Sequence, residues 1–157
     1  MEAWGIARAL HVLGVLLWIG GVAMVTTVLL PAVQRMSDRD GMAIFRRLEH
    51  RFAAQARWTT QLVGLSGLYM VHHADMWSRF ADPAFWWMHA MVLVWALFTV
   101  MLFVVEPFVL KRRAAAGASR DPQQRLRAVQ RTHWLMLLLS LVTVAGAAAG
   151  SHGVHFF

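Results

Sequence analysis

Histidine is the residue type in this 157-residue chain that is best suited to chemistry, and its positions follow a pattern. Six of the eight histidines lie near the same end of four strongly apolar segments: His11, His72, His73, His89, His152 and His155. Imidazole nitrogens bind haem iron, copper and zinc. Because every apolar segment contributes at least one imidazole at a similar depth, the pattern predicts a bound metal or haem.

The depth of these histidines narrows the prediction. With a helical rise of about 1.5 Å per residue, one histidine of each segment lies within roughly 6 Å of the edge of the bilayer at this end. These four are His11, His73, His89 and His152. Two such imidazoles would be the axial ligands of a b-type haem held between helices. We expect His11 and His89 to be that pair, since each is followed by a long uninterrupted helix. His72, His73 and His152 are second choices, as ligands or as partners that orient the ligands.

The residues around His11 favour a planar cofactor. His11, Gly14, Trp18, Gly21 and Val25 recur every three or four residues and so share one helix face. A glycine one turn from a ligand leaves room for a porphyrin. The plain alternative is that water or lipid headgroups satisfy each histidine near the interface, without any cofactor.

Copper is the rival cofactor. The chain has no cysteine, which excludes iron–sulfur clusters, thiolate metal sites and covalently attached haem. Thioether sulfur together with imidazole suits Cu(I). Four methionines share the outer layer with the histidines: Met70, Met76, Met88 and Met91. Methionine is also an ordinary apolar filler, so these residues have a structural interpretation as well.

Polar residues at the opposite, inner end form a second candidate site: Glu49, His50, Arg57, Gln61, Glu106 and His133. Glu106 lies about one turn inside the membrane in the run LFVVEPFVL, where an ionised carboxylate needs a partner. Arg57 or Arg131 would form an ion pair with it, and a proton path or a quinone-binding carboxylate are the functional alternatives. His50 and His133 could hold a second haem whose propionates meet nearby arginines.

Four apolar segments must position these residues, and each has about the 20 residues that a helix needs to cross a bilayer. The predicted spans are 6–33, 56–77, 84–110 and 133–154. They predict an all-α fold, a four-helix transmembrane bundle in which residues 1–157 form one integral-membrane domain. The stretch GMAIFRRLEHRFAAQARW predicts an amphipathic helix that continues into the second span, and Pro83 is well placed to start the third.

Two further features concern the packing of the spans. Pro107 follows Glu106 directly and should kink the third span, which would free a carbonyl near Phe103 for a polar contact. The run GAAAG at 146–150 permits close approach of a neighbouring helix. The alternative is that this run forms the interface of a homodimer.

The distribution of charge sets the orientation. Thirteen of the fifteen Lys and Arg residues lie between spans one and two or between spans three and four, if Arg57 at the start of the second span is counted with the first of these loops. Loops rich in these residues face the cytoplasm, so both termini and the histidine-rich end should face the periplasm of a bacterial inner membrane. The net charge of +7 is then explained by contact with anionic membrane lipids and not by nucleic acid. Phosphate-binding-loop, serine-hydrolase and dinucleotide motifs are missing, which argues against hydrolytic or nucleotide chemistry.

Three stretches carry a family resemblance: ALHVLGVLLWIGGVAMVTTVLLPAVQR, GLSGLYM and WWMHAMVLVWALFTVMLFVVEPFVL. They resemble the CopD-type family of small bacterial membrane proteins and, more distantly, the HemJ-type protoporphyrinogen oxidases. The informative motif is L-H-x-x-G-x-x-x-W-x-G-G around His11. The first resemblance implies copper uptake or resistance with His11 as a copper contact. The second implies haem b bound through His11.

These observations predict a b-type haem protein, with one haem or two, that transfers electrons near the periplasmic face. Quinone or a membrane redox protein would be its partner, and a haem-dependent oxidoreductase its enzyme class. The alternatives are a copper-binding or copper-transport protein and an accessory subunit without a cofactor.

Overall fold

The computed structural model describes residues 2–36, 38–108 and 122–152, and nearly all of them are helical. The described part contains no β-strand, which confirms the all-α prediction. The helical elements are α1 (Glu2–Met24), the π-helix η1 (Val25–Leu29), α2 (Leu30–Gln34), α3 (Asp38–His73), the 3₁₀-helices η2 (Met76–Ala81) and η3 (Pro83–Phe85), α4 (Trp86–Val100), the π-helix η4 (Met101–Val105) and α6 (Pro122–Ser151).

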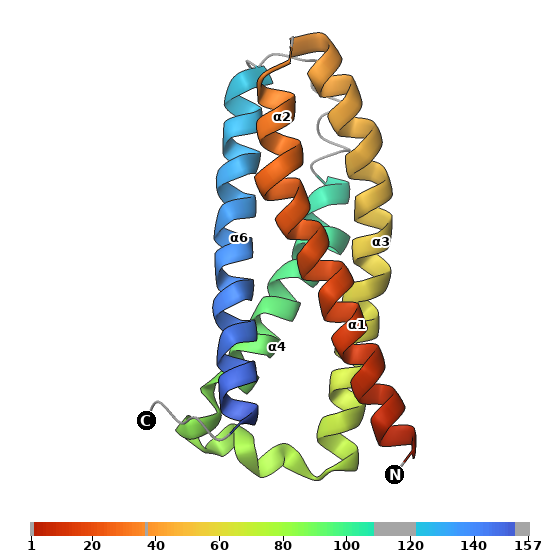
Figure 1. Ribbon diagram of the computed structural model, residues 1–157, viewed down its shortest axis with the longest axis vertical. Helices are drawn as coiled ribbons and strands as arrows, with labels where there is room; N and C mark the ends of the chain where they lie inside the picture. Colours follow the sequence, from red (N-terminus) through yellow and green to blue (C-terminus); the bar gives the residue numbers. More distant parts are fainter. Residues whose placement is uncertain (1, 37, 109–121, 153–157) are drawn as a thin grey trace.

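The long helices run side by side along the long axis of the molecule (Figure 1). α1 packs along α3, and α4 packs against α6. The start of α1, the end of α6 and the short helices η2 and η3 all lie at the lower end in Figure 1, which we call the outer end. The opposite end, where α2 and the start of α3 lie, is called the inner end.

Three helical stretches are long and apolar enough to cross a membrane: Glu2–Gln34, Pro83–Phe108 and Leu126–Ser151. They coincide with the first, third and fourth predicted spans, except that residues 109–110 and 153–154 lie outside the described residues. Many of their apolar side chains are exposed, as lipid-facing residues are. The chain is therefore a multi-pass membrane protein.

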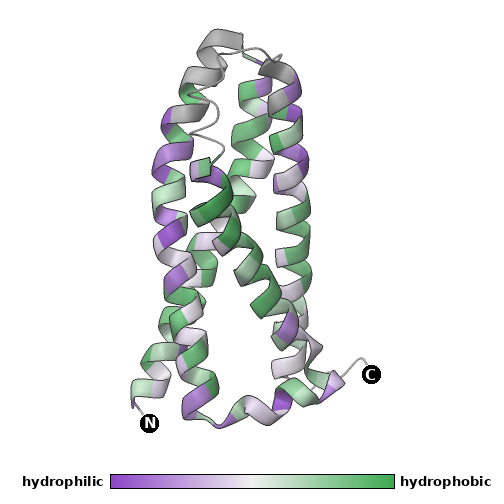
Figure 2. Ribbon diagram, turned by 180° about the vertical axis from the view of Figure 1, so that it is seen from behind, coloured by the Kyte–Doolittle hydropathy of each residue, from purple (hydrophilic) through white to green (hydrophobic). Residues whose placement is uncertain are grey.

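The second predicted span, 56–77, lies in the last part of α3 and is not among these three stretches. Hydrophilic residues recur along α3, whereas apolar residues dominate α4 (Figure 2). The helix also ends earlier than predicted, at His73. Asp75 has φ 49°, a left-handed conformation that does not continue an α-helix, and the 3₁₀-helix η2 follows. The predicted amphipathic stretch before the span is confirmed as a helix continuous with it, since α3 begins at Asp38.

The core lies where the apolar faces of the helices meet. On α1 the buried residues Ala7, Gly14, Trp18 and Val22 are three to four residues apart or multiples of that spacing, so they share one face. Trp18 packs edge-on against Phe98 of α4, with ring centroids 4.8 Å apart. A second cluster near the inner end contains Val25, Leu30, Val33 and Leu126.

Each π-helix ends two residues before a proline. The Leu30 N–H bonds to the Val25 carbonyl, and the Glu106 N–H bonds to the Met101 carbonyl, five residues earlier in both cases. In the same register, the carbonyl of Thr26 faces the nitrogen of Pro31, and the carbonyl of Leu102 faces the nitrogen of Pro107. A proline nitrogen carries no hydrogen and cannot donate. Each π-helix therefore leaves one carbonyl oxygen without a donor in its own helix.

Pro83 starts the third predicted span as expected. It is the first residue of η3, which leads directly into α4. The Asp82 side chain accepts a hydrogen bond from the Ala84 N–H at 2.9 Å and so caps this start.

Candidate functional site

His11 has hydrogen-bond partners on a neighbouring helix. Its Nδ1 lies 3.0 Å from the carbonyl oxygen of Val63 and 3.1 Å from Oγ of Ser66, both on α3. A carbonyl oxygen only accepts, so Nδ1 carries the hydrogen and donates it. The Ser66 hydroxyl donates to the Leu62 carbonyl at 2.6 Å, which leaves its oxygen free to accept from His11. Nε2 of His11 then presents its lone pair and has no partner among the described residues.

Two glycines bring α1 and α3 close together at this histidine. A Cβ atom on Gly67 would lie 3.2 Å from Cε1 of His11, and a Cβ on Gly14 would lie 2.8 Å from Cγ2 of Val63. Side chains at either position would push the helices apart or displace the ring. The glycines therefore fix both the approach of the helices and the orientation of the imidazole.

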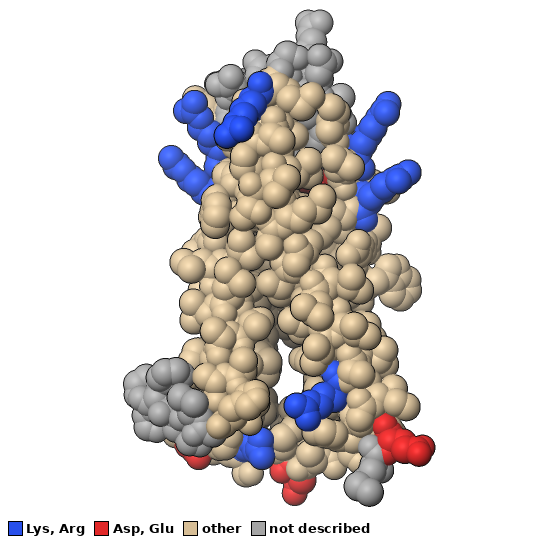
Figure 3. Space-filling model, viewed as in Figure 1, with Lys and Arg blue, Asp and Glu red and all other residues tan. Residues whose placement is uncertain are grey.

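The outer half of the molecule is hollowed. In the space-filling view an opening lies in the lower half, and α1 with α3 lies on one side of the molecule there, with α4 and α6 on the other (Figures 1 and 3). His11 belongs to this half, because it lies in the first part of α1.

His89 does not share these surroundings. It is exposed on α4, one turn from the exposed residues Val92 and Leu93, whereas Met88 and Val94 are buried on the other face of that helix. Its ring meets Phe80 edge-on at 5.3 Å. The imidazole therefore points away from the core, and the predicted axial pair of His11 and His89 gains no support.

The remaining outer histidines that the structure describes also lie at the surface. His72 and His73 are exposed at the end of α3, and the His73 ring stacks on Tyr69 at 5.4 Å. His152 is exposed, and its Nδ1 bonds to the Ala148 carbonyl of its own helix at 2.8 Å. His155 lies outside the described residues. Within the described part of the chain, no three His, Asp or Glu residues are grouped so as to hold a metal ion.

The methionines of the copper alternative lie on three elements. Met88 is buried on α4, whereas Met70 on α3, Met76 in η2 and Met91 on α4 are half-buried.

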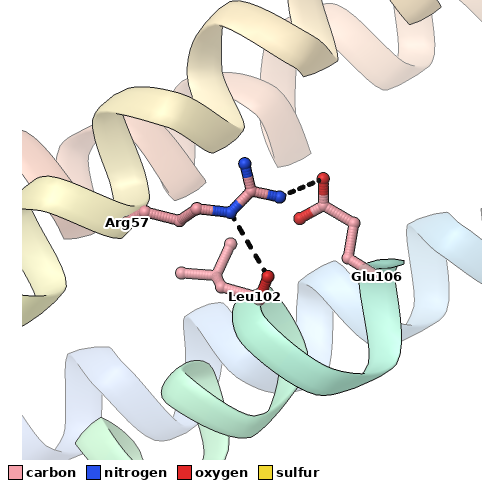
Figure 4. A network of polar contacts seen from close by, with 3 residues as sticks. All are labelled: Arg57, Leu102 and Glu106. Carbon is pink, nitrogen blue, oxygen red and sulfur yellow. Dashed lines mark hydrogen bonds and ion pairs between the residues drawn. The ribbon is translucent and has the colours of Figure 1, made fainter. Parts of the chain in front are cut away.

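At the inner end, Arg57 of α3 and Glu106 form an ion pair, as predicted. Nη2 of Arg57 lies 3.0 Å from Oε1 of Glu106, and Nε donates to the Leu102 carbonyl at 3.3 Å (Figure 4). Leu102 carries the carbonyl that η4 and Pro107 leave without a donor. The sequence predicted this free carbonyl near Phe103, and the π register places it one residue earlier.

A matching contact at η1 was not predicted. Nε2 of Gln130, on α6, donates to the Thr26 carbonyl at 2.8 Å. Thr26 is the residue whose carbonyl faces Pro31 in the π register. The signal was present in the sequence, because Pro31 predicts a freed carbonyl in the first span by the same argument that applies to Pro107.

The other predicted inner residues lie elsewhere on α3 and α6. His50 is exposed on α3, as is Arg131 on α6, and Glu49 and Gln61 are half-buried on α3. Nδ1 of His133 bonds to the Val129 carbonyl of its own helix at 3.0 Å. The structure therefore adds no support for a second haem between His50 and His133.

The glycine run of α6 packs within the chain, as predicted. Gly146 and Gly150 leave room for the indole rings of Trp86 and Trp87 on α4. This face of α6 is thus covered by α4, and a homodimer remains a prediction without a located surface.

Comparison with known proteins identifies no relative: no family model matches the chain, and no curated protein or solved structure is significantly similar to it. The resemblance to CopD-type and HemJ-type proteins therefore stays a prediction based on the motif around His11.

Proposed function

We propose that this chain is a membrane redox protein that binds one b-type haem in its outer half through His11. The observation that carries the proposal is the hydrogen bonding of His11. Among the described outer histidines it alone is held by a neighbouring helix, with Nδ1 donating to Val63 and Ser66 and Nε2 free. A metal-ligating histidine is usually oriented in this way, since the bond at one ring nitrogen fixes the other toward the metal.

The surroundings of His11 fit such a group. The ring is half-buried, and its free nitrogen is a good ligand for haem iron. The room for a porphyrin that the sequence predicted beside Gly14 is filled by Val63, so the haem would lie elsewhere around the ring. The opening in the same half of the molecule offers space between the two helix pairs (Figure 3). His11 would be the axial ligand from the protein, and haem would supply reversible one-electron transfer.

Val63 and Ser66 would act on the cofactor through His11. Their oxygens hold the hydrogen on Nδ1 and restrict rotation of the ring, and a hydrogen bond to that hydrogen also raises the basicity of the ligand. Trp18 lies seven residues after His11 on α1, toward the inner end, and its side chain is 3% exposed and belongs to the core.

We further propose a four-helix transmembrane bundle in a bacterial inner membrane with both termini in the periplasm. The exposed arginines near the inner end support this orientation: Arg35, Arg47, Arg51, Arg127 and Arg131. Figure 3 shows Arg side chains projecting from both sides of the upper half, whereas at the outer end both Arg and the acidic Asp and Glu side chains are seen. Such an asymmetry is typical of cytoplasmic ends of membrane helices.

The test is the absorption spectrum of the full chain, purified in detergent after expression with a haem precursor. We expect a Soret band that shifts on reduction with dithionite, and about one iron per chain. His11→Ala should abolish the band. His89→Ala is the matched control, because the exposed His89 should be dispensable.

Three outcomes would overturn the proposal. Colourless protein with stoichiometric copper would favour the copper-binding alternative, and colourless protein without metal would favour a cofactor-free subunit. Full haem retention by His11→Ala together with loss in His89→Ala would show that the wrong ligand has been chosen.

A further inference from the structure

The ion pair at the inner end faces the surface of the molecule. The side chain of Arg57 is 34% exposed and that of Glu106 is 25% exposed. Glu106 belongs to a stretch that is apolar enough to cross a membrane, so part of this surface borders lipid. A pair used only to join two helices would be more stable if it were shielded from hydrocarbon.

The pair also has unused hydrogen-bonding capacity. Nε and Nη2 of Arg57 are engaged by Leu102 and Glu106, but Nη1 has no partner among the described residues and points away from both of them (Figure 4). The second carboxylate oxygen of Glu106 likewise has no described partner. A donor and an acceptor are thus presented together at one position.

Exposed aromatic side chains lie next to the residues of this site in the sequence, about 100° further around each helix. Trp58 follows Arg57 and is 81% exposed, and Phe103 follows Leu102 and is 45% exposed. Indole and phenyl faces offer flat apolar surfaces to a flat ring.

We propose that Arg57 and Glu106 bind the head of a lipid-soluble quinone or quinol, which enters from the bilayer between α3 and the end of η4. A quinone carbonyl accepts a hydrogen bond from Nη1 of Arg57, and a quinol hydroxyl donates to the free oxygen of Glu106. The assignment rests on the proposed redox function, because that function calls for a membrane-soluble electron carrier.

The balance of charge favours this ligand over an anionic phospholipid. The pair carries one positive and one negative group, so its net charge is zero, and Glu106 would repel a phosphate placed against Arg57. A neutral ring with both donor and acceptor oxygens matches the two free groups.

The test uses the full chain in lipid nanodiscs and a photoreactive azidoquinone, with the cross-linked residues identified by mass spectrometry. Cross-links are expected in the peptides that contain Trp58 and Phe103. Competition by decylubiquinone should give an affinity that weakens at least tenfold in Glu106→Gln and in Arg57→Gln. Arg131→Gln is the matched control, since it removes an exposed arginine near the same end of the molecule.

Because the two pair variants also lose an interhelical contact, Trp58→Ala is measured as well. It leaves the ion pair intact and should weaken binding several-fold without changing the unfolding temperature. Cross-links at the outer end, competition by anionic phospholipid as strong as by the quinone, or equal affinities in all variants would overturn the proposal.

The same measurement on His11→Ala separates this proposal from that of the haem. Quinone binding should survive in that variant, since His11 lies on α1 in the outer half. Loss of the haem band with quinone binding retained would leave the Arg57–Glu106 site standing. A haem band in a protein that binds no quinone would contradict the quinone site and leave the haem proposal standing.

Discussion

Gln130 of α6 donates a hydrogen bond from Nε2 to the carbonyl oxygen of Thr26, 2.8 Å away. The bond satisfies a carbonyl that Pro31 leaves without a donor, and Arg57 does the same for Leu102 at the other π-helix. A polar side chain from a neighbouring helix thus completes both proline-induced π-helices.

Replacement of Gln130 by leucine should destabilise the protein by about 1 kcal/mol, the usual order for a hydrogen bond between membrane helices. Unfolding in detergent measures the change. The double variant with Pro31→Ala is the sharper test, because an alanine N–H can bond to Thr26 in place of Gln130. In the Pro31→Ala background, the loss of stability caused by Gln130→Leu should therefore fall toward zero. An unchanged loss would contradict the explanation.

Removal of one member of the Arg57–Glu106 pair should cost more stability than removal of both. Glu106→Leu leaves an arginine without its anion, whereas Arg57→Leu with Glu106→Leu leaves no charge at the position. The unfolding temperatures of the two single variants and the double variant check this. A double variant less stable than either single variant would contradict it.

Ser66→Ala should weaken haem retention about tenfold, because it removes one acceptor from His11 and leaves Val63 as the other. Ser140→Ala is the matched control: Ser140 is also buried and, like Ser66, donates to a carbonyl of its own helix, but it has no hydrogen bond to His11. Haem loss during dialysis against apomyoglobin provides the measurement. Equal loss in the two variants would argue against a role for Ser66.

Gly14→Ala should lower stability by about 1–3 kcal/mol, the usual cost of overpacking, because the new methyl group would press on Val63. Gly20 lies on the same helix with no atom within 4 Å of an added Cβ, so Gly20→Ala should be tolerated. Thermal unfolding of both variants decides the matter. Equal effects would mean that α1 and α3 approach each other less closely.

The absence of cysteine makes the topology directly testable. A single cysteine in place of Ser78, in η2, should react with an impermeant maleimide added to intact cells. A cysteine in place of the exposed Gln124, at the start of α6, should react only after the cells are opened. The reverse pattern would invert the proposed orientation.

Parts of this arrangement follow from the sequence and parts do not. The pairing of Arg57 with Glu106 could be predicted because a carboxylate within an apolar run needs a cation, and few are at the same depth. The sequence could not predict which face of α4 points toward the core, because apolar residues surround this helix on all sides and give no preferred face. His89 was therefore assigned from its depth and from the long helix that follows it, and the structure places it on the exposed face beside Val92.

The role of Ser66 was also beyond the sequence argument. It is a small polar residue in a span, and its contact with His11 depends on the axial alignment of α1 with α3. That alignment is set by how Gly14 packs against Val63 and Gly21 against Phe52. Each of these pairings joins residues far apart in the chain, and no periodicity within one helix specifies them.

The described side-chain hydrogen bonds that join the two helix pairs are those of Arg57, Trp95 and Gln130, and all three lie in the middle or toward the inner end. At the outer end, η2 and η3 join the two pairs through the chain itself. A flat guest that enters from this end would therefore not have to break any of the three bonds.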